Sequence, residues 1–160
     1  GVDIFRYLMG APKTLTGYAR TQIHDIEVED SAVAIIEFEG GAIGTIEGST
    51  ACYPGYPRRV EICGDKGSIV LEEDAILKWD VDIPCRLPVG KPADNVASSD
   101  PMAISNAGHV RHFANFTNAI LHNEPLLADA RIGRLPLEII LSVYKSSQTG
   151  RPVDMEELRI

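Results

Sequence analysis

Apolar residues recur with a helical period at both ends of the chain and with a strand period through its middle. Val2, Phe5 and Leu8 are spaced for one helix face in the opening GVDIFRYLMG, which predicts a first helix. Residues 13–26 are rich in β-branched and aromatic types, and residues 31–38 read SAVAIIEF. Both of these stretches predict strands.

Glycine-bearing turns separate the further strands that the pattern predicts. Gly40 and Gly41 predict a hairpin into AIGTIEGST, and GDKG joins the expected strands RRVEIC and GSIVLEE, which AILKW continues. In residues 31–38, Val33 and Ile35 point to one face of the strand. The other face carries Ala34, Ile36 and Phe38, so both faces are apolar. We therefore expect helices of the chain to cover one face and a second subunit to cover the other.

Two amphipathic helices follow the expected sheet. The first, in HVRHFANFTNAILHNEPL, begins at Ser105 or Asn106 and the second lies in LPLEIILSVYKSSQTG. Pro136 is expected near the start of the second helix, because in its interior a proline removes a hydrogen bond. Gly150 ends this helix. The expected apolar stripes are Phe113, Phe116, Ile120 and Leu121 on the first helix and Leu137, Ile140, Leu141 and Tyr144 on the second.

This order of elements predicts an α+β fold, a predominantly antiparallel, open-faced sheet with helices packed on one face and the other face used for oligomerisation. The length of 160 residues fits a single domain over residues 1–160. A long proline-rich loop is expected within it at residues 80–108, either functional or a linker.

Composition narrows the function classes. The net charge of −8 argues against nucleic-acid and membrane-surface partners, which are polyanionic, and favours a small molecule or a protein. Three cysteines without a pairing motif indicate a reducing cytoplasm. No stretch approaches the ~20 apolar residues of a membrane span, so a soluble protein is expected.

The chain resembles the C-terminal domain of the Gfo/Idh/MocA family of NAD(P)-dependent oxidoreductases, of the inositol and glucose-fructose type. The resemblance rests on the order and spacing of five segments: VDIFRYLMG, EDSAVAIIEFEGGAIGTIEGST, YPGYPRRVEICGDKGSIVLEE, GHVRHFANFTNAILHNEPL and EIILSVYKSSQTGRPV.

The resemblance implies that an N-terminal Rossmann domain, absent here, binds NAD or NADP in a longer parent chain. The family's Asp-x-x-x-His pair is expected just before Gly1, so this fragment is expected to be inactive and to hold no cofactor. Gly40, Gly41 and Gly44 do not form the dinucleotide fingerprint, because they lie between two strands and not before a helix. A homodimer or homotetramer through the sheet face is expected.

Five residues are candidates for substrate binding. The resemblance implies that Asp3 follows the catalytic His by one helical turn and that Tyr56 lies in the pocket of inositol-type members. Tyr53 lies in the same proline-held turn, and Arg59 offers a guanidinium to an anionic group of the substrate. His109 starts a helix from which its imidazole can reach a cleft. Four of them have a structural alternative: a helix-start carboxylate for Asp3, aromatic caps of the sheet end for the two tyrosines, and a solvated strand face or pairing with Glu61 for Arg59.

No catalytic, cofactor-binding or metal-binding residue is expected in the chain. His109 and His112 are suitably spaced for a metal pair, but no further ligands accompany them. The favoured function is a substrate-binding and oligomerisation domain of an enzyme acting on a sugar, a polyol or a related hydroxy compound. The alternatives are an NAD-using glycosidase on the same scaffold and a non-enzymatic association module.

Overall fold

The computed structural model describes residues 1–73, 75–90 and 106–158, which form two compact units. The main unit comprises residues 2–53 and the described residues from 111 onward, and the small unit comprises Gly1 and the described residues between 54 and 110. The expected single domain stays a prediction. Most of the expected loop at residues 80–108 lies outside the described residues, as does Ser105.

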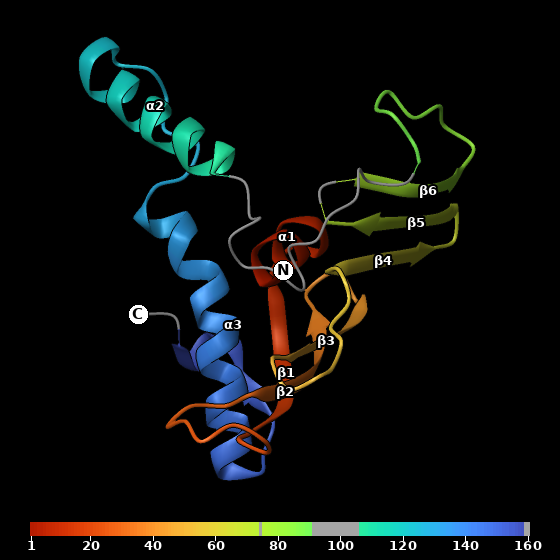
Figure 1. Cartoon of the computed structure of the whole chain (residues 1–160), viewed down its shortest axis with the longest axis vertical. Coiled ribbons are helices and arrows are strands. Elements are labelled where there is room, and N and C mark those ends of the chain that lie inside the picture. The colour runs from red at the N-terminus through yellow and green to blue at the C-terminus, as the bar shows by residue number, and fades with distance from the viewer. Residues whose placement is uncertain (74, 91–105, 159–160) are drawn as a thin grey trace. The chain divides into compact units, whose positions relative to one another are not determined.

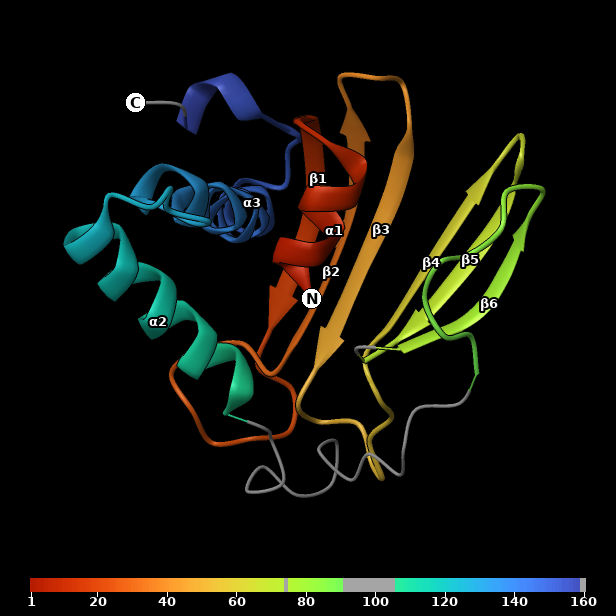
Figure 2. The same cartoon turned by 90° about the horizontal axis from the view of Figure 1, so that it is seen from above.

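The main unit is a four-stranded antiparallel sheet with helices on one side (Figures 1 and 2). The strand order is β3-β2-β1-β7, and β2 pairs with β1 and β3 along its whole length. This arrangement confirms the expected α+β class. In chain order the elements are α1 (Val2–Met9), β1 (Pro12–Arg20), β2 (Ser31–Phe38), β3 (Ile43–Ser49), most of α2 (Ala107–His122), α3 (Ala130–Thr149), β7 (Val153–Asp154) and the 3-10 helix η2 (Met155–Leu158).

The core of the main unit lies between the sheet and the two helices α1 and α3. Alternation along β2 buries Ala34, Ile36 and Phe38, while Val33 and Ile35 remain about half exposed on the opposite face. Phe5 of α1 packs edge-on against Phe38, with ring centroids 5.5 Å apart. Leu15, Ile139, Val143 and Met155 complete the buried apolar cluster.

Glycine allows α1 to lie close to β3. A Cβ atom on Gly44 would stand 2.4 Å from Cζ of Phe5, so a side chain here would displace the aromatic ring. Gly17 has the same role under α3, because its Cβ would meet the carbonyl oxygen of Val33 at 2.9 Å and Cγ1 of Val143 at 3.2 Å. Both helices therefore depend on glycines in the strands beneath them.

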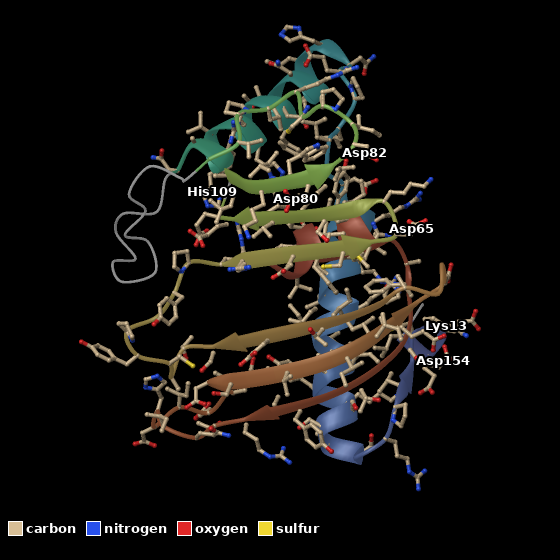
Figure 3. All side chains as sticks on the ribbon, turned by 90° about the vertical axis from the view of Figure 1, so that its right-hand side faces the viewer. Lys13, Asp65, Asp80, Asp82, His109 and Asp154 are labelled. Carbon is tan, nitrogen blue, oxygen red and sulfur yellow. The ribbon has the colours of Figure 1, made fainter. Side chains whose placement is uncertain are left out.

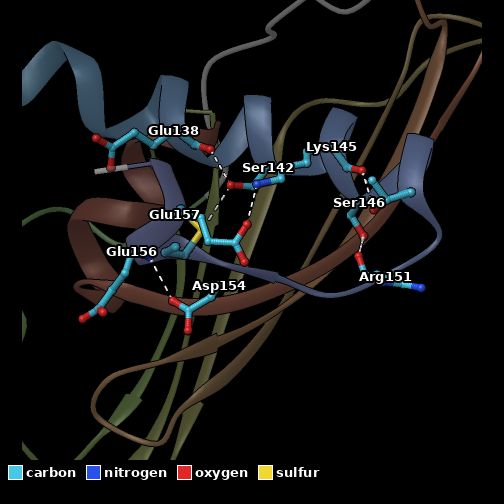
Figure 4. A network of polar contacts seen from close by, with 10 residues as sticks. Glu138, Ser142, Lys145, Ser146, Arg151, Asp154, Glu156 and Glu157 are labelled. Carbon is cyan, nitrogen blue, oxygen red and sulfur yellow. Dashed lines mark hydrogen bonds and ion pairs between the residues drawn. The ribbon is translucent and has the colours of Figure 1, made fainter. Parts of the chain in front are cut away.

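Serine hydroxyls of α3 take the place of a neighbouring strand along the free part of β1. β7 pairs with β1 only at Thr14 and Leu15. Farther along, the backbone N–H of Gly17 donates to Oγ of Ser146, and that of Ala19 donates to Oγ of Ser147, each at 3.0 Å. The Ser146 hydroxyl donates onward to the carbonyl oxygen of Arg151 at 2.8 Å (Figure 4).

The buried side of α3 differs from the expected apolar stripe. Leu137 and Leu141 are about half exposed, whereas Ser142 and Ser146 are buried. The Ser146 hydroxyl lies inward because it accepts the N–H of Gly17 in β1, whereas the buried Ser142 hydroxyl donates within its own helix to the carbonyl oxygen of Glu138 at 2.8 Å. The spacing of apolar residues does not predict which side of α3 is buried, because a hydrogen bond from β1 to Ser146 determines it.

Pro136 was wrongly expected near the start of the last helix. The helix begins earlier, after the N-cap Asp129, whose side chain accepts the backbone N–H groups of Arg131 and Ile132 at 3.0 and 2.9 Å. Pro136 therefore lies within α3. The expected end is confirmed, because Gly150 adopts the left-handed conformation (φ 67°) and donates to the carbonyl oxygen of Ser146.

The small unit is a three-stranded antiparallel sheet in the order β4-β5-β6. Its strands are β4 (Arg59–Gly64), β5 (Gly67–Glu72) and β6 (Ala75–Val81). Val70 at the centre is buried. Arg58 and Glu73 close one end, since the N–H of Arg58 donates to Oε1 of Glu73 and the N–H of Glu73 donates to the carbonyl oxygen of Arg58, each at 2.8 Å.

The β1–β2 connection is organised by one buried carboxylate. Asp30 is 2% exposed, and its Oδ2 accepts the backbone N–H groups of Ile23 at 2.7 Å and His24 at 3.0 Å, while Oδ1 accepts that of Gln22 at 3.0 Å. β1 consequently ends at Arg20 and not at residue 26 as expected, because these amides bind Asp30 and do not continue the ladder.

The same hydrogen bonds set the protonation of Asp30. Those from His24 and Ile23 lower its pKa well below the ordinary value, and burial opposes them only in part. Because the folded-state pKa lies below that of the unfolded chain, the ionised carboxylate stabilises the fold above about pH 4, the ordinary Asp pKa. This stability is lost as the pH falls through the folded-state pKa.

Asp30→Asn is therefore expected to lower the Tm at pH 7 and to flatten its decline between pH 5 and pH 3. The amide cannot gain stability from ionisation and is a weaker acceptor for three N–H groups. Thermal unfolding followed by circular dichroism across this pH range measures both effects. Asp25→Asn, on an exposed residue of the same connection, is the control. If Tm falls equally steeply between pH 5 and pH 3 in the wild type and in Asp30→Asn, the proposed role of Asp30 is contradicted.

Candidate functional site

A cavity of about 410 Å³ lies in the main unit on the helix side of the sheet, a volume in the range of small-molecule sites. Val2, in the first turn of α1, lines it, as do Ala32 and Ala34 of β2, which leave room because their side chains are small. Ile139 and Val143 of α3 form an apolar wall. The cavity therefore offers a mainly apolar surface next to the start of α1.

Polar groups line the cavity where β2 begins and β3 ends. They are Glu29, Asp30, Ser31, Ser49 and Thr50. Most of them already bind one another: the hydroxyls of Ser31 and Ser49 are 3.0 Å apart, and the N–H of Thr50 donates to the carbonyl oxygen of Asp30 at 2.8 Å. These bonds fix the shape of the polar end.

Tyr144 and Glu29 form the charge-assisted contact of this site. The Tyr144 hydroxyl donates to Oε1 of Glu29 at 2.8 Å. This hydrogen bond, burial and the charge of Glu29 together raise the pKa of Tyr144, so the phenol stays protonated and acts as a donor. The pair also lines a second hollow of about 420 Å³ beside Arg20 and Gln148.

The candidate residues from the sequence are divided between the units. In the main unit, Asp3 is exposed in the first turn of α1, next to Val2 of the cavity wall, and Tyr53 is 97% exposed. In the small unit, Tyr56 is 84% exposed, and Arg59 binds Oε2 of Glu61 at 3.1 Å. The ion pair supports the structural alternative for Arg59. Their roles in substrate binding stay predictions.

His109 is exposed in the first turn of α2, at the position labelled in Figure 3. Within residues 1–73, 75–90 and 106–158, no three His, Cys, Asp or Glu side chains are grouped as a metal site requires. Across this same part of the chain, no helix combines the length and apolar character of a membrane span.

The Gly40–Gly41 turn does not fit the phosphates of a dinucleotide. Gly40 and Gly41 lie in the turn between β2 and β3, where Gly41 has φ 80° and its N–H donates to the carbonyl oxygen of Phe38 at 2.9 Å. A phosphate-binding glycine loop leads from a strand into a helix, so that the helix N-terminus faces the phosphates. This turn leads from a strand into a strand and provides no such helix.

Sequence reasoning did not identify Glu29, Asp30 or Tyr144 as cavity residues. Asp30 follows a polar stretch and precedes a strand, a position at which Asp commonly binds nearby backbone N–H groups. The sequence therefore contained a pattern from which the role of Asp30 could have been predicted. Tyr144 was assigned to an apolar stripe, and its hydroxyl found a partner 115 positions away in sequence. No local pattern predicts a contact over that separation.

Comparison with known proteins gives consistent results. The GFO/IDH/MocA C-terminal domain family matches residues 1–70. The chain is 22% identical to myo-inositol 2-dehydrogenase of Thermotoga maritima, over 98% of this chain and 47% of the relative. It is 38% identical to scyllo-inositol 2-dehydrogenase (NAD(+)) of Bacillus subtilis, over 43% of this chain and 22% of the relative.

A solved structure shows the same fold. The WlbA dehydrogenase from Bordetella pertussis, in complex with NADH and UDP-GlcNAcA, matches with a TM-score of 0.76 and 23% identity, over 96% of this chain and 41% of that one. The chain thus spans less than half the length of each of these three proteins. The resemblance predicted from the sequence is confirmed: residues 1–70 match the GFO/IDH/MocA C-terminal domain family, and nearly the whole chain has the fold of the solved dehydrogenase.

Proposed function

We propose that this chain is the substrate-binding and oligomerisation domain of an NAD(P)-dependent oxidoreductase acting on a sugar, a polyol or a related hydroxy compound. The observation that carries the proposal is the match of nearly the whole chain to the family fold, together with relatives named as inositol dehydrogenases. In this proposal NAD or NADP binds an N-terminal Rossmann domain of the full-length polypeptide and supplies the hydride chemistry.

The contribution of this chain is one wall of the substrate cleft. Asp3 lies beside the cavity wall and carries an exposed carboxylate, which accepts hydrogen bonds from substrate hydroxyls. Tyr53 and Tyr56 present exposed phenol rings that stack on the C–H faces of a sugar. Arg59 and His109 remain candidates for an anionic group of the substrate. Each of these side chains binds or orients, and none has to form a bond.

The outer face of the four-stranded sheet is the proposed oligomer interface. It carries the exposed apolar side chains Tyr18, Val33, Ile35 and Ile43 in adjacent register positions. Threonines and the carboxylates of Glu37 and Glu47 lie among them, so the face is mixed in character. Such a composition is common in subunit interfaces, and a homodimer or homotetramer is proposed.

The proposal is tested by comparing the 160-residue chain with the full-length polypeptide. Titration calorimetry with NAD and absorbance at 340 nm with myo-inositol, scyllo-inositol and UDP-sugars as substrates measure binding and turnover. The full-length protein is expected to reduce the cofactor with at least one of them, and the short chain neither binds NAD at micromolar concentration nor reacts. Micromolar NAD binding to the short chain would contradict the assignment, as would turnover without net cofactor reduction.

Asp3→Asn in the full-length enzyme is expected to lower kcat/KM by roughly tenfold, mainly through KM, because a hydrogen bond to a charged acceptor contributes about 1.5–3 kcal/mol. Asp25→Asn keeps the same chemistry on an exposed residue of the β1–β2 connection and serves as the control. Steady-state kinetics for both variants check the effect. An unchanged kcat/KM in Asp3→Asn would leave this residue with its helix-start role only.

Ile35→Glu is expected to convert the oligomer to a monomer. The residue lies at the centre of the outer sheet face and is 56% exposed, so the substitution costs a monomer little but buries a charge in a dimer. Light scattering after size-exclusion chromatography measures the mass. Leu87→Glu, on an apolar side chain of the small unit that is 65% exposed, should leave the mass unchanged. A wild-type monomer would contradict this interface.

A further inference from the structure

A second, smaller cavity of about 240 Å³ lies in the main unit at the last turn of α1. It is lined by Arg6, Ala11, Pro12, Leu135, Glu138 and Met155, which come from α1, β1, α3 and η2 and the residue before β1. None of these residues lines the candidate site at the other end of α1. The small cavity is therefore a separate feature of the main unit.

Arg6 brings a buried hydrogen-bond donor to this cavity. The residue is half-buried, and its Nε atom is buried and meets no acceptor within the described part of the chain. Native structures satisfy nearly all such groups through protein, ordered water or an ion, because an unpaired buried donor costs stability. The position of Arg6 in the last turn of α1 favours its positive charge. That position does not provide an acceptor for Nε.

The carboxylate that lines the cavity is bonded to a different arginine. Glu138 is 9% exposed, and its Oε1 lies 2.7 Å from Nε of Arg134. Arg134 also donates through Nη2 to the carbonyl oxygen of Leu158 at 3.0 Å. Glu138 is thus held in place at the cavity wall, and its carboxylate leaves the Nε of Arg6 unsatisfied.

We infer that this cavity binds a hydrogen phosphate ion between Arg6 and Glu138. A guanidinium carries donors only, in a planar fork that matches the oxygens of a phosphate. An ionised carboxylate carries acceptors only, so an anion that lies beside Glu138 has to donate a proton of its own. Hydrogen phosphate has both kinds of group, since it retains a P–O–H at neutral pH. Sulfate retains no proton and offers Glu138 only repulsion.

Water alone is the other possible occupant of the cavity. It can bond to both side chains, but it brings no negative charge to offset the guanidinium of Arg6, and a partly buried charge is costly without one. The apolar side chains of Leu135 and Met155 line the cavity and strengthen a charged hydrogen bond there, because they lower the local dielectric. The inference is independent of the proposed function, since it involves neither the cofactor nor the substrate.

The test is phosphorus NMR of inorganic phosphate with the 160-residue chain and with the full-length polypeptide. Exchange onto the protein broadens the phosphate line, and a competing anion narrows it again. Sulfate is expected to compete at a concentration at least about tenfold higher than unlabelled phosphate requires, because it forms no hydrogen bond with Glu138. The absence of saturable broadening, or equal competition by sulfate and phosphate, would overturn the inference.

Two variants locate the binding. Arg6→Lys keeps the charge but loses the fork and its Nε, so phosphate binding should weaken by roughly tenfold. Arg131→Lys, on an exposed arginine of α3, is the matched control and should bind like the wild type. Equal binding by Arg6→Lys and the wild type would overturn the inference, because the phosphate would then lie elsewhere.

Glu138→Gln separates an anion site from a merely structural role. The amide donates as well as accepts, so sulfate is expected to compete within about threefold of phosphate in this variant. Unchanged discrimination against sulfate would contradict the role of Glu138 and overturn the inference. Circular dichroism shows whether each variant folds. If Glu138→Gln does not fold, the comparison of the two anions in the wild type and in Arg6→Lys decides the inference.

Discussion

The contact between α3 and β1 is the constraint on which the main unit depends. In the order β3-β2-β1-β7, β1 lies next to last, yet beyond Leu15 it has no partner strand among the described residues on the side away from β2. Ser146 and Ser147 bind the N–H groups of Gly17 and Ala19, so the edge is satisfied by a helix lying close above it. An unpaired buried N–H costs about 1–3 kcal/mol, a substantial part of the 5–15 kcal/mol that stabilises a typical domain.

Several features of the molecule follow from this contact. Because α3 turns serines inward, its Leu137 and Leu141 remain partly exposed, and Gly17 must lack a side chain to admit the helix. The same placement brings Tyr144 to Glu29 and forms one wall of the cavity beside α1. Asp30 then closes the far end by holding the β1–β2 connection. The packing of α3 on β1 therefore determines the shape of the candidate site and the positions of its polar residues.

Apart from the end of β1, the strands of the main unit could be predicted closely from the sequence, whereas the orientation of the helices could not. Residues 31–38 form β2 within the expected bounds, since alternation reports directly which side chains share a face. For α2 and α3, apolar periodicity indicated the wrong buried side. Hydrogen bonds of Asn115 in α2 and of Ser146 in α3 determine which side of each helix faces the chain. The family resemblance depended on segment order and was unaffected by this error, while Glu29 and Tyr144 required the folded structure.

The central claim is that the chain forms a substrate-side half that leaves cofactor binding to another part of its polypeptide. A crystal structure of the full-length protein with NADH and a bound polyol tests it most directly. The account predicts that every contact to the cofactor phosphates comes from residues outside these 160, with the polyol near the first turn of α1. Cofactor phosphates bound at the Gly40–Gly41 turn, or a polyol far from α1, would contradict it.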